Sequence, residues 1–130
     1  MLNELTESKK NLISMVGTKD ISEMIKPLSR DIYLFDTYIA GTTYLKDPSV
    51  LDEIKPGDKL ILQREDNKFD SNAILVLNED KKKLGYVPEV DNTVFARLMD
   101  AGKLLFGKIK NIEPKGSFRL INIEIFLMDF

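Results

Sequence analysis

The sequence predicts a small α+β fold, mainly β, in which six strands form a closed or nearly closed barrel together with one internal helix. Three observations support this class. Short apolar runs alternate with turn residues over residues 30–130. One segment in the second half has helical rather than strand periodicity. The length of 130 residues suits one ordinary domain with a core of its own.

The first 28 residues predict a helical arm that precedes the barrel. Apolar residues recur there at helical spacing up to Val16, and Gly17 suits the end of a helix. A second short helix is expected to end at Pro27. We therefore predict two parts, an N-terminal helical extension at 1–29 and a barrel domain at 30–130.

The first strands of the barrel are expected at intervals set by turn residues. A β-rich run starts at Arg30, and one short helix follows over 48–54. The turn at 55–58 contains Pro56 and Gly57, of which the first fixes one dihedral angle and the second relaxes the next. Three further strands are expected over 59–64, 72–77 and 83–87.

The last third of the sequence predicts the internal helix and a hairpin. The helix is expected over 92–101, with Asp91 or Asn92 as its N-terminal cap and Gly102 at its end. Its expected buried stripe consists of Val94, Phe95, Leu98 and Met99. Two strands over 104–112 and 117–127 are expected to form a hairpin across the turn at 113–116.

The composition excludes several kinds of chemistry. The sequence contains no Cys and no His, which rules out disulfides, a zinc site, a Cys nucleophile and a His general base. We expect no cofactor. Residues 1–10 are polar, unlike a signal peptide, and no apolar run approaches the roughly 18 residues that a membrane span needs. The sequence therefore favours a cytoplasmic protein with no membrane partner.

The charge pattern argues against indiscriminate binding of polyanions. The formal net charge is −2, whereas non-specific DNA-binding proteins usually carry a basic surplus. Basic residues nevertheless cluster at 81–83 and again over 103–119. The simplest interpretation of each cluster is a solvated hairpin tip.

The segment from Leu62 to Ile74 organises the rest of the sequence. Two apolar runs flank a loop rich in Asp and Asn, whose side chains bond nearby backbone groups and tolerate unusual dihedral angles. The loop contains one exposed-looking aromatic residue, Phe69, and two basic residues, Arg64 and Lys68. A strand–loop–strand unit of this kind presents binding side chains from a rigid base.

Four segments over about residues 34–112 resemble, in their order, a HIRAN domain. They are Ile39-Ala40-Gly41-Thr42-Thr43-Tyr44, Pro56-Gly57-Asp58-Lys59-Leu60, the run from Arg64 to Ile74, and Leu84-Gly85-Tyr86-Val87-Pro88. The resemblance implies a small β-barrel related to OB and SH3-like folds, and binding of single-stranded DNA at a free 3′ end. The family occurs on DNA-remodelling ATPases and beside nucleases and helicases. This sequence lacks the Gly-x-x-x-x-Gly-Lys-Ser/Thr loop of an ATPase motor.

Aromatic residues near turns are candidates for base stacking. Tyr44, Phe69 and Tyr86 stand next to turn residues or at strand ends, and a stacked base contributes about 1–3 kcal/mol. Alternatively, each ring packs into the barrel. With the polar candidates, the predicted DNA-binding set is Thr43, Tyr44, Arg64, Asn67, Lys68, Phe69, Asp70 and Tyr86.

Asp70 is the most informative candidate because a carboxylate repels phosphate. Its ionised oxygens suit a terminal hydroxyl, which can donate a hydrogen bond to them. A 3′-phosphorylated end would be rejected by charge repulsion. The alternative is that Asp70 and Asn72 only fasten the loop to its own backbone.

Two positions differ from the family pattern. Thr43 stands where DNA-binding eukaryotic members have an arginine, and Glu89 stands where members often have a basic residue. Each difference removes a candidate phosphate contact. Arg64, Lys68 and the lysines of 103–110 are the candidates to replace them.

Three functions are compatible with the sequence. We favour a non-catalytic module that recognises single-stranded DNA ends with a free 3′-hydroxyl, in DNA repair or processing. The alternative is a protein-interaction adaptor that docks a helicase or nuclease through the helical arm. An enzyme is the least favoured, because the pair Asp66 and Asp70 could hold Mg²⁺ but has no third ligand or basic clamp beside it.

Overall fold

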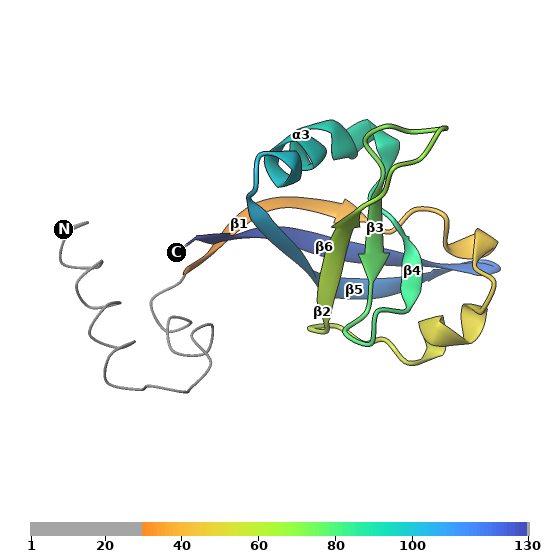
Figure 1. Ribbon diagram of the computed structural model, residues 1–130. Coiled ribbons are helices and arrows are strands. Elements are labelled where there is room, and N and C mark those ends of the chain that lie inside the picture. Colours follow the sequence, from red (N-terminus) through yellow and green to blue (C-terminus); the bar gives the residue numbers. More distant parts are fainter. Residues whose placement is uncertain (1–29, 130) are drawn as a thin grey trace, which may run out of the picture. The chain divides into compact units, whose positions relative to one another are not determined.

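Six strands form one curled antiparallel sheet, in the order β1-β6-β5-β2-β3-β4 (Figure 1). The computed structural model describes residues 30–129, so the predicted helical arm at 1–28 lies outside the described residues. The strands are β1 Arg30–Tyr38, β2 Lys59–Arg64, β3 Ile74–Leu77, β4 Lys83–Tyr86, β5 Leu104–Lys115 and β6 Phe118–Asp129. The single α-helix of this region, α3, spans Glu89–Asp100.

One short bridge joins the two ends of the strand order. Ala40, just after β1, pairs with Tyr86 of β4 through two backbone hydrogen bonds of 2.8 and 2.9 Å. Next to it, the Ile39 amide donates to the Ile121 carbonyl at 3.0 Å, which keeps the chain on β6. We call this bridge between Ala40 and Tyr86 the seam. The sheet is thus nearly closed, and the predicted six-stranded, OB-like barrel is confirmed.

Alternation along the strands fills the interior. Ile121, Ile123 and Ile125 of β6 are fully buried at every second position, and their intervening neighbours face outward. Burying one such side chain contributes about 1.5–3 kcal/mol. The other strands add Leu60, Leu62, Ile74, Val76, Leu84, Leu105 and Ile109 to the same core. Phe95 and Ala96 of α3 cover it from the helix side.

Helix α3 starts three residues earlier than predicted. Pro88 occupies the N-cap position, with a φ of −57° that suits a helix start, and Glu89 and Asp91 place negative charge in the first turn. The prediction that Asp91 or Asn92 caps the helix is therefore wrong. Asn92 instead lies inside the helix, with only 2% of its surface exposed.

The buried face of α3 includes Asn92 and Ala96, which the predicted stripe lacked, and does not include Val94. Val94 is 63% exposed, and Ala96 is buried in its place. The buried face runs from Asn92 through Phe95 and Ala96, at spacings of three and four residues. The first residue of this face, Asn92, is polar, so the apolar pattern alone did not include it. The predicted stripe was therefore rotated slightly about the helix axis relative to the observed one.

The β5–β6 hairpin is longer than predicted. Both strands continue to the tip, where Lys115 pairs with Phe118 across Gly116 and Ser117. Pro114, expected in the turn, pairs with Arg119 within the ladder. Strand β2 pairs with β5 only at Phe106–Lys108, so one edge of β5 is unpaired near the tip, and a proline is tolerated at such an edge.

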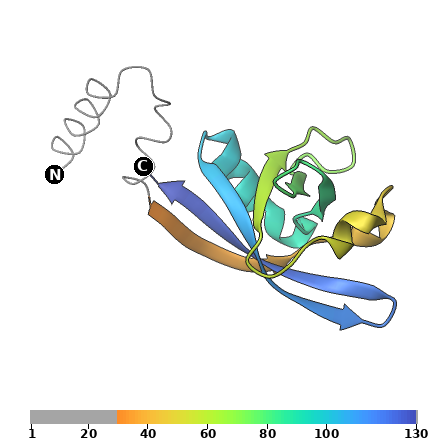
Figure 2. The same ribbon diagram turned by 90° about the horizontal axis from the view of Figure 1, so that it is seen from below.

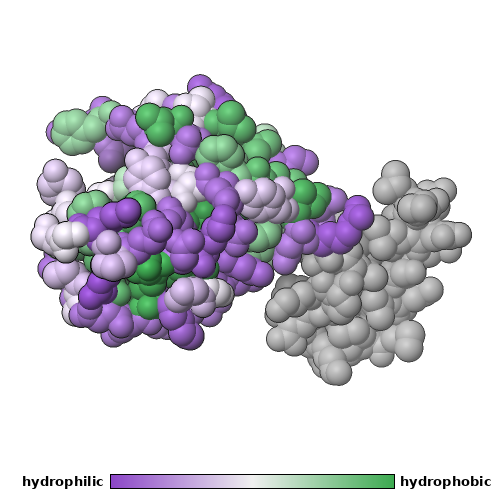
Figure 3. Space-filling view, turned by 180° about the vertical axis from the view of Figure 1, so that it is seen from behind, coloured by the Kyte–Doolittle hydropathy of each residue, from purple (hydrophilic) through white to green (hydrophobic). Residues whose placement is uncertain are grey.

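Two 3₁₀ helices connect β1 to β2, η2 at Thr42–Tyr44 and η3 at Pro48–Asp52. The second is the expected short helix, two residues shorter than predicted. On the side of the molecule seen in Figure 3, apolar side chains form separate patches bordered by hydrophilic ones. Within residues 30–129 no helix is long and apolar enough to span a membrane.

Candidate nucleic-acid interface

The loop at 65–73 is an ordered platform that presents Phe69. Asn67 and Asp70 form an isolated antiparallel bridge, and the Glu65 amide donates to the Ala73 carbonyl at 3.0 Å at the base of the loop. The Asn67 side chain accepts a hydrogen bond from the Phe69 amide at 2.8 Å. These bonds fix the backbone on both sides of Phe69, a residue that is 83% exposed. The ammonium of Lys68 lies 5.2 Å from the centre of the Phe69 ring.

Asp70 anchors the loop to helix α3. Its Oδ2 accepts a hydrogen bond from the buried Asn92 side chain at 2.8 Å, and its Oδ1 accepts one from the Asn72 amide at 2.9 Å. Figures 1 and 2 show the loop beside the first half of α3. The bond from the Asn72 amide is a contact of the kind expected if Asp70 fastens the loop to its own backbone. An ionised carboxylate has about four lone-pair sites, so two accepted bonds leave each oxygen able to accept another.

Arg64 clamps the same loop from its other side. Its guanidinium donates to the carbonyls of Ala73 at 2.6 Å and Ser71 at 2.8 Å. Its Nε forms an ion pair with Asp100 at the end of α3, at 2.9 Å. The pair lowers the pKa of the Asp100 carboxyl, chiefly through this hydrogen bond. In this arrangement Arg64 acts as an internal clamp rather than as a free cation.

A groove of about 330 Å³ opens between the loop and the seam. Phe69 and Asp70 line one wall, and Tyr86 with Ala40 lines the other. The complete lining is Ala40, Gly41, Asn67, Phe69, Asp70, Ala73, Tyr86, Val87 and Glu89. We call it the end groove. Among these described residues two are carboxylates and none is a cation.

Tyr86 is half-buried at the junction of the end groove and the seam. The ammonium of Lys83 lies 4.6 Å from the centre of its ring and 3.3 Å from its hydroxyl. The neighbouring Glu65 carboxylate is the largest cause of a raised pKa at the Tyr86 hydroxyl, because it favours the protonated phenol. The phenol is thus neutral at physiological pH.

The structure brings some of the predicted residues together and separates others. Asn67, Phe69, Asp70 and Tyr86 line the end groove. Tyr44, which is 88% exposed, lines a neighbouring cavity, and Thr43 lines a third one. Phe69 and Tyr44 are not packed in the barrel, so the alternative that these two rings belong to the core is wrong.

Sequence reasoning missed two positions that build the site. Asn92 holds Asp70, and Ala40 forms the seam that places Tyr86. A polar residue on the core-facing side of a predicted helix is the signal that could have indicated Asn92. The pairing of Ala40 with Tyr86 joins residues far apart in the sequence, and no local pattern indicates it.

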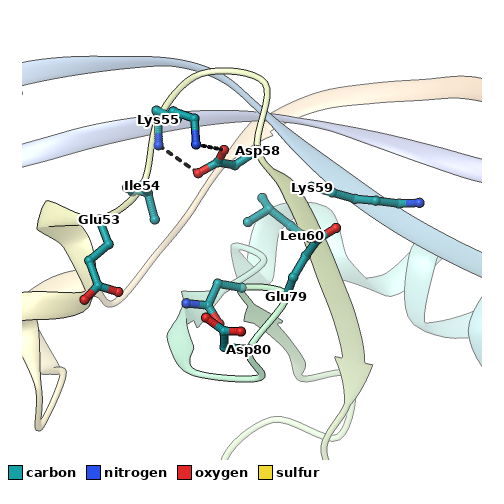
Figure 4. Close-up of a pocket in the computed structure, with 9 residues that line it drawn as sticks. Glu53, Ile54, Lys55, Asp58, Lys59, Leu60, Glu79 and Asp80 are labelled. Atoms are coloured by element: carbon teal, nitrogen blue, oxygen red, sulfur yellow. Dashed lines mark hydrogen bonds and ion pairs between the residues drawn. The ribbon is translucent and has the colours of Figure 1, made fainter.

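A further cavity of about 260 Å³ lies on a different part of the sheet and contains several acids (Figure 4). Both oxygens of Asp58 already have a partner in Lys55. The Lys55 backbone amide donates to Oδ2 at 3.0 Å, and the Lys55 ammonium lies 3.1 Å from Oδ1. The other carboxylates of the lining are Glu53, Glu79 and Asp80. Within residues 30–129 no group of three or more His, Cys, Asp or Glu could hold a metal ion.

Comparisons with known proteins agree with this architecture. A crystal structure of a protein from Lactobacillus plantarum has a TM-score of 0.73 and 27% identity, and the match covers 78% of this chain and 99% of that chain. The crystal structure of the HIRAN domain of human HLTF has a TM-score of 0.60, covers 76% of this chain and 79% of that chain, and shows the fold alone because its identity is 16%. No curated protein matches the chain.

The family assignment comes from a model of the HIRAN domain, which matches residues 32–127. This range contains all six strands apart from the first two residues of β1 and the last two of β6, together with α3, the seam and the end groove. The chain belongs to the HIRAN domain family, a family of nucleic-acid-binding domains.

Proposed function

We propose that the protein binds the free 3′-hydroxyl end of single-stranded DNA and acts as a non-catalytic module in DNA repair or processing. The observation that carries this proposal is the end groove, in which the exposed ring of Phe69 stands beside two carboxylates and no lining cation. A ring of this kind offers a face to a base of any sequence. The acidic lining disfavours a phosphate.

The chemistry of Asp70 gives the end preference. A terminal hydroxyl donates a hydrogen bond to an ionised carboxylate, and such charge-assisted bonds are stronger than neutral ones. A 3′-phosphate is mostly doubly ionised at neutral pH, so it largely lacks such a proton and would bring a charge of about −1.5 to −2 against Asp70 and Glu89. The two bonds from Asn92 and Asn72 hold the carboxylate in place for this contact.

The test compares three labelled oligonucleotides of one sequence: a strand with a 3′-hydroxyl, the same strand with a 3′-phosphate, and a blunt duplex. Fluorescence anisotropy should give the tightest binding for the 3′-hydroxyl strand. Phe69→Ala should weaken that binding by about 1–3 kcal/mol, the contribution of one stacked base. Equal affinity for the three ligands, or none for any, would contradict the proposal.

Asp70→Asn separates end recognition from general affinity. The amide keeps the size of the carboxylate but removes its charge, so the ratio of hydroxyl to phosphate affinity should fall towards one. Asp66→Asn is the matched control, because Asp66 lies in the same loop but does not line the end groove. An unchanged ratio in Asp70→Asn would remove the role given to this residue.

The adaptor alternative stays a prediction. It assigns docking of a helicase or nuclease to the arm at 1–28, which lies outside the described residues. Full-length protein and a form without residues 1–28 should differ in a pull-down of such a partner if the arm has this role.

A further inference from the structure

A second cavity beside the end groove has the opposite charge. It has a volume of about 510 Å³ and lies between the segment after η2 and the turn that joins β3 to β4. Its lining consists of Tyr44, Leu45, Lys46, Asp47, Val50, Lys82 and Lys83. Three lysines and one aspartate give this lining a formal charge of +2, whereas Asp70 and Glu89 give the end groove −2. We call it the lysine cleft.

Direct contacts connect the two sites. Tyr86 lines the end groove, and its ring and hydroxyl are in contact with Lys83 of the lysine cleft at 4.6 and 3.3 Å. In addition, the Tyr44 amide donates to the Gly41 carbonyl at 3.1 Å, and Gly41 lines the end groove. A strand that leaves the end groove past Tyr86 or Gly41 therefore meets the lysine cleft next.

The lysines of the cleft are available to an anion. Lys46 makes no ion pair with another residue of the described region, and Lys82 has only a contact of 3.9 Å with the exposed carboxylate of Glu53. Exposed pairs of this kind contribute little and are readily exchanged. The one carboxylate of the lining, Asp47, is outnumbered by three lysines, and its Oδ1 accepts from the Ser49 amide at 3.2 Å and caps η3.

The cleft also offers a stacking surface. Tyr44, which is 88% exposed, lines the cleft together with the aliphatic side chains of Leu45 and Val50. A basic groove combined with a free aromatic ring is the arrangement that single-strand binders use for backbone and bases.

We propose that the lysine cleft binds the sugar–phosphate backbone of the nucleotides immediately 5′ to the terminal one. This inference rests on the proposed 3′-end function and gives it a second subsite. The end groove selects an uncharged terminus, and Lys46, Lys82 and Lys83 neutralise the phosphates that the end groove cannot accommodate. This order sets the polarity of the strand: its 3′ terminus lies in the end groove, and the chain continues in the 5′ direction into the lysine cleft.

The test measures the salt dependence of binding to a 3′-hydroxyl oligothymidylate by anisotropy. Lys46→Gln combined with Lys82→Gln removes two cations without altering the contact between Lys83 and Tyr86. For single strands the slope of log K against log salt changes by about 0.7 per phosphate contact, so the double variant should lose about 1.4 in slope. Its ratio of hydroxyl to phosphate affinity should stay at the wild-type value.

The matched control is Lys55→Gln combined with Lys115→Gln, which removes the same charge from two lysines that line neither the end groove nor the lysine cleft. It should keep the wild-type slope. If wild type shows the end preference but the cleft variant keeps its slope, or the control loses as much, the lysine cleft is not the backbone site. If wild type shows no end preference or no binding, the proposed function fails first and this inference fails with it.

Discussion

At the scale of single residues, the site depends on side chains that hold other side chains. Asp70 can point a free lone pair into the end groove because Asn92 and the Asn72 amide take one lone pair on each oxygen. Asn92 is nearly fully buried, so its amide cannot exchange this bond for one to water. Hydrogen bonds to charged groups contribute about 1.5–3 kcal/mol, and losing one partner leaves the other unsatisfied.

Asn92→Ala should therefore affect both stability and recognition. We expect a loss of about 1–3 kcal/mol in the free energy of unfolding, measured by urea titration. The preference for a 3′-hydroxyl end should fall as well, because Asp70 loses its anchor to α3. Asn72→Ala is the control, since its side chain makes only an exposed contact of 3.4 Å with Thr93. If the two variants are equally stable, Asn92 does not have the anchoring role.

The clamp formed by Arg64 and Asp100 predicts a dependence on pH. Hydrogen bonding to Arg64 lowers the pKa of the Asp100 carboxyl in the folded protein below its value in the unfolded chain. The stabilisation by this pair is complete above the pKa of Asp100 in the unfolded chain, about 3.9. It is lost as the pH falls through the lower, folded pKa.

Asp100→Asn should flatten the decline of stability with acid in that window. Urea midpoints measured from pH 6 down to pH 2 should fall less steeply below about pH 4 than in wild type. Asp80→Asn, which removes an exposed carboxylate without an ion pair among the described residues, should follow the wild-type curve. A wild-type curve from Asp100→Asn would show that the clamp does not contribute.

At the scale of elements, the seam places two of the predicted segments against each other. Gly85 permits this approach, because a Cβ at that position would lie 2.3 Å from the Ala40 carbonyl oxygen and 2.6 Å from the Ile39 side chain. Distances under 3.0 Å require the backbone to move. The glycine of the Leu84-Gly85-Tyr86-Val87-Pro88 segment is thus explained by the bridge between Ala40 and Tyr86.

Gly85→Ala should open the seam. Forcing an extra methyl group into packed structure costs about 1–3 kcal/mol, and here the obstacle is backbone. Thermal unfolding should show the loss, and amide exchange at Ala40 and Tyr86 should speed up. Gly57→Ala is the control, because nothing lies within 4 Å of the added Cβ. Only the left-handed backbone at Gly57 disfavours alanine there, so amide exchange at Ala40 and Tyr86 should stay as slow as in wild type. Slow exchange at Ala40 in Gly85→Ala would contradict this account.

The elements were predictable where the pattern is local. Strand β2 has the predicted bounds, because alternation and the turn with Pro56 and Gly57 define it. The start of α3 was not predictable from apolar spacing, since Asn92 occupies a buried position on its face. Within the site, Phe69 and Asp70 were indicated by the loop composition. The seam and the anchor from Asn92 arise from contacts between distant segments, which no local pattern encodes.

At the scale of the whole molecule, a net charge of −2 is compatible with DNA binding because the charges are separated. The end groove is lined by carboxylates and the lysine cleft by lysines. A duplex or an internal stretch of strand would bring phosphates to both sites, whereas a free 3′ end brings them only to the second. The proposed selectivity for ends thus has a source in the arrangement of charge and needs no basic surplus.

The central claim is tested most directly by an NMR titration of the ¹⁵N-labelled full chain with a short single strand. With a 3′-hydroxyl strand, the largest amide shifts should occur at Asn67–Asn72 and at Tyr86, Val87 and Glu89, followed by Tyr44–Asp47 and Lys82–Lys83. The 3′-phosphate strand should leave the first group nearly unchanged. Shifts of equal size with both strands, or shifts confined to residues outside the two cavities, would contradict recognition of the strand end in this groove.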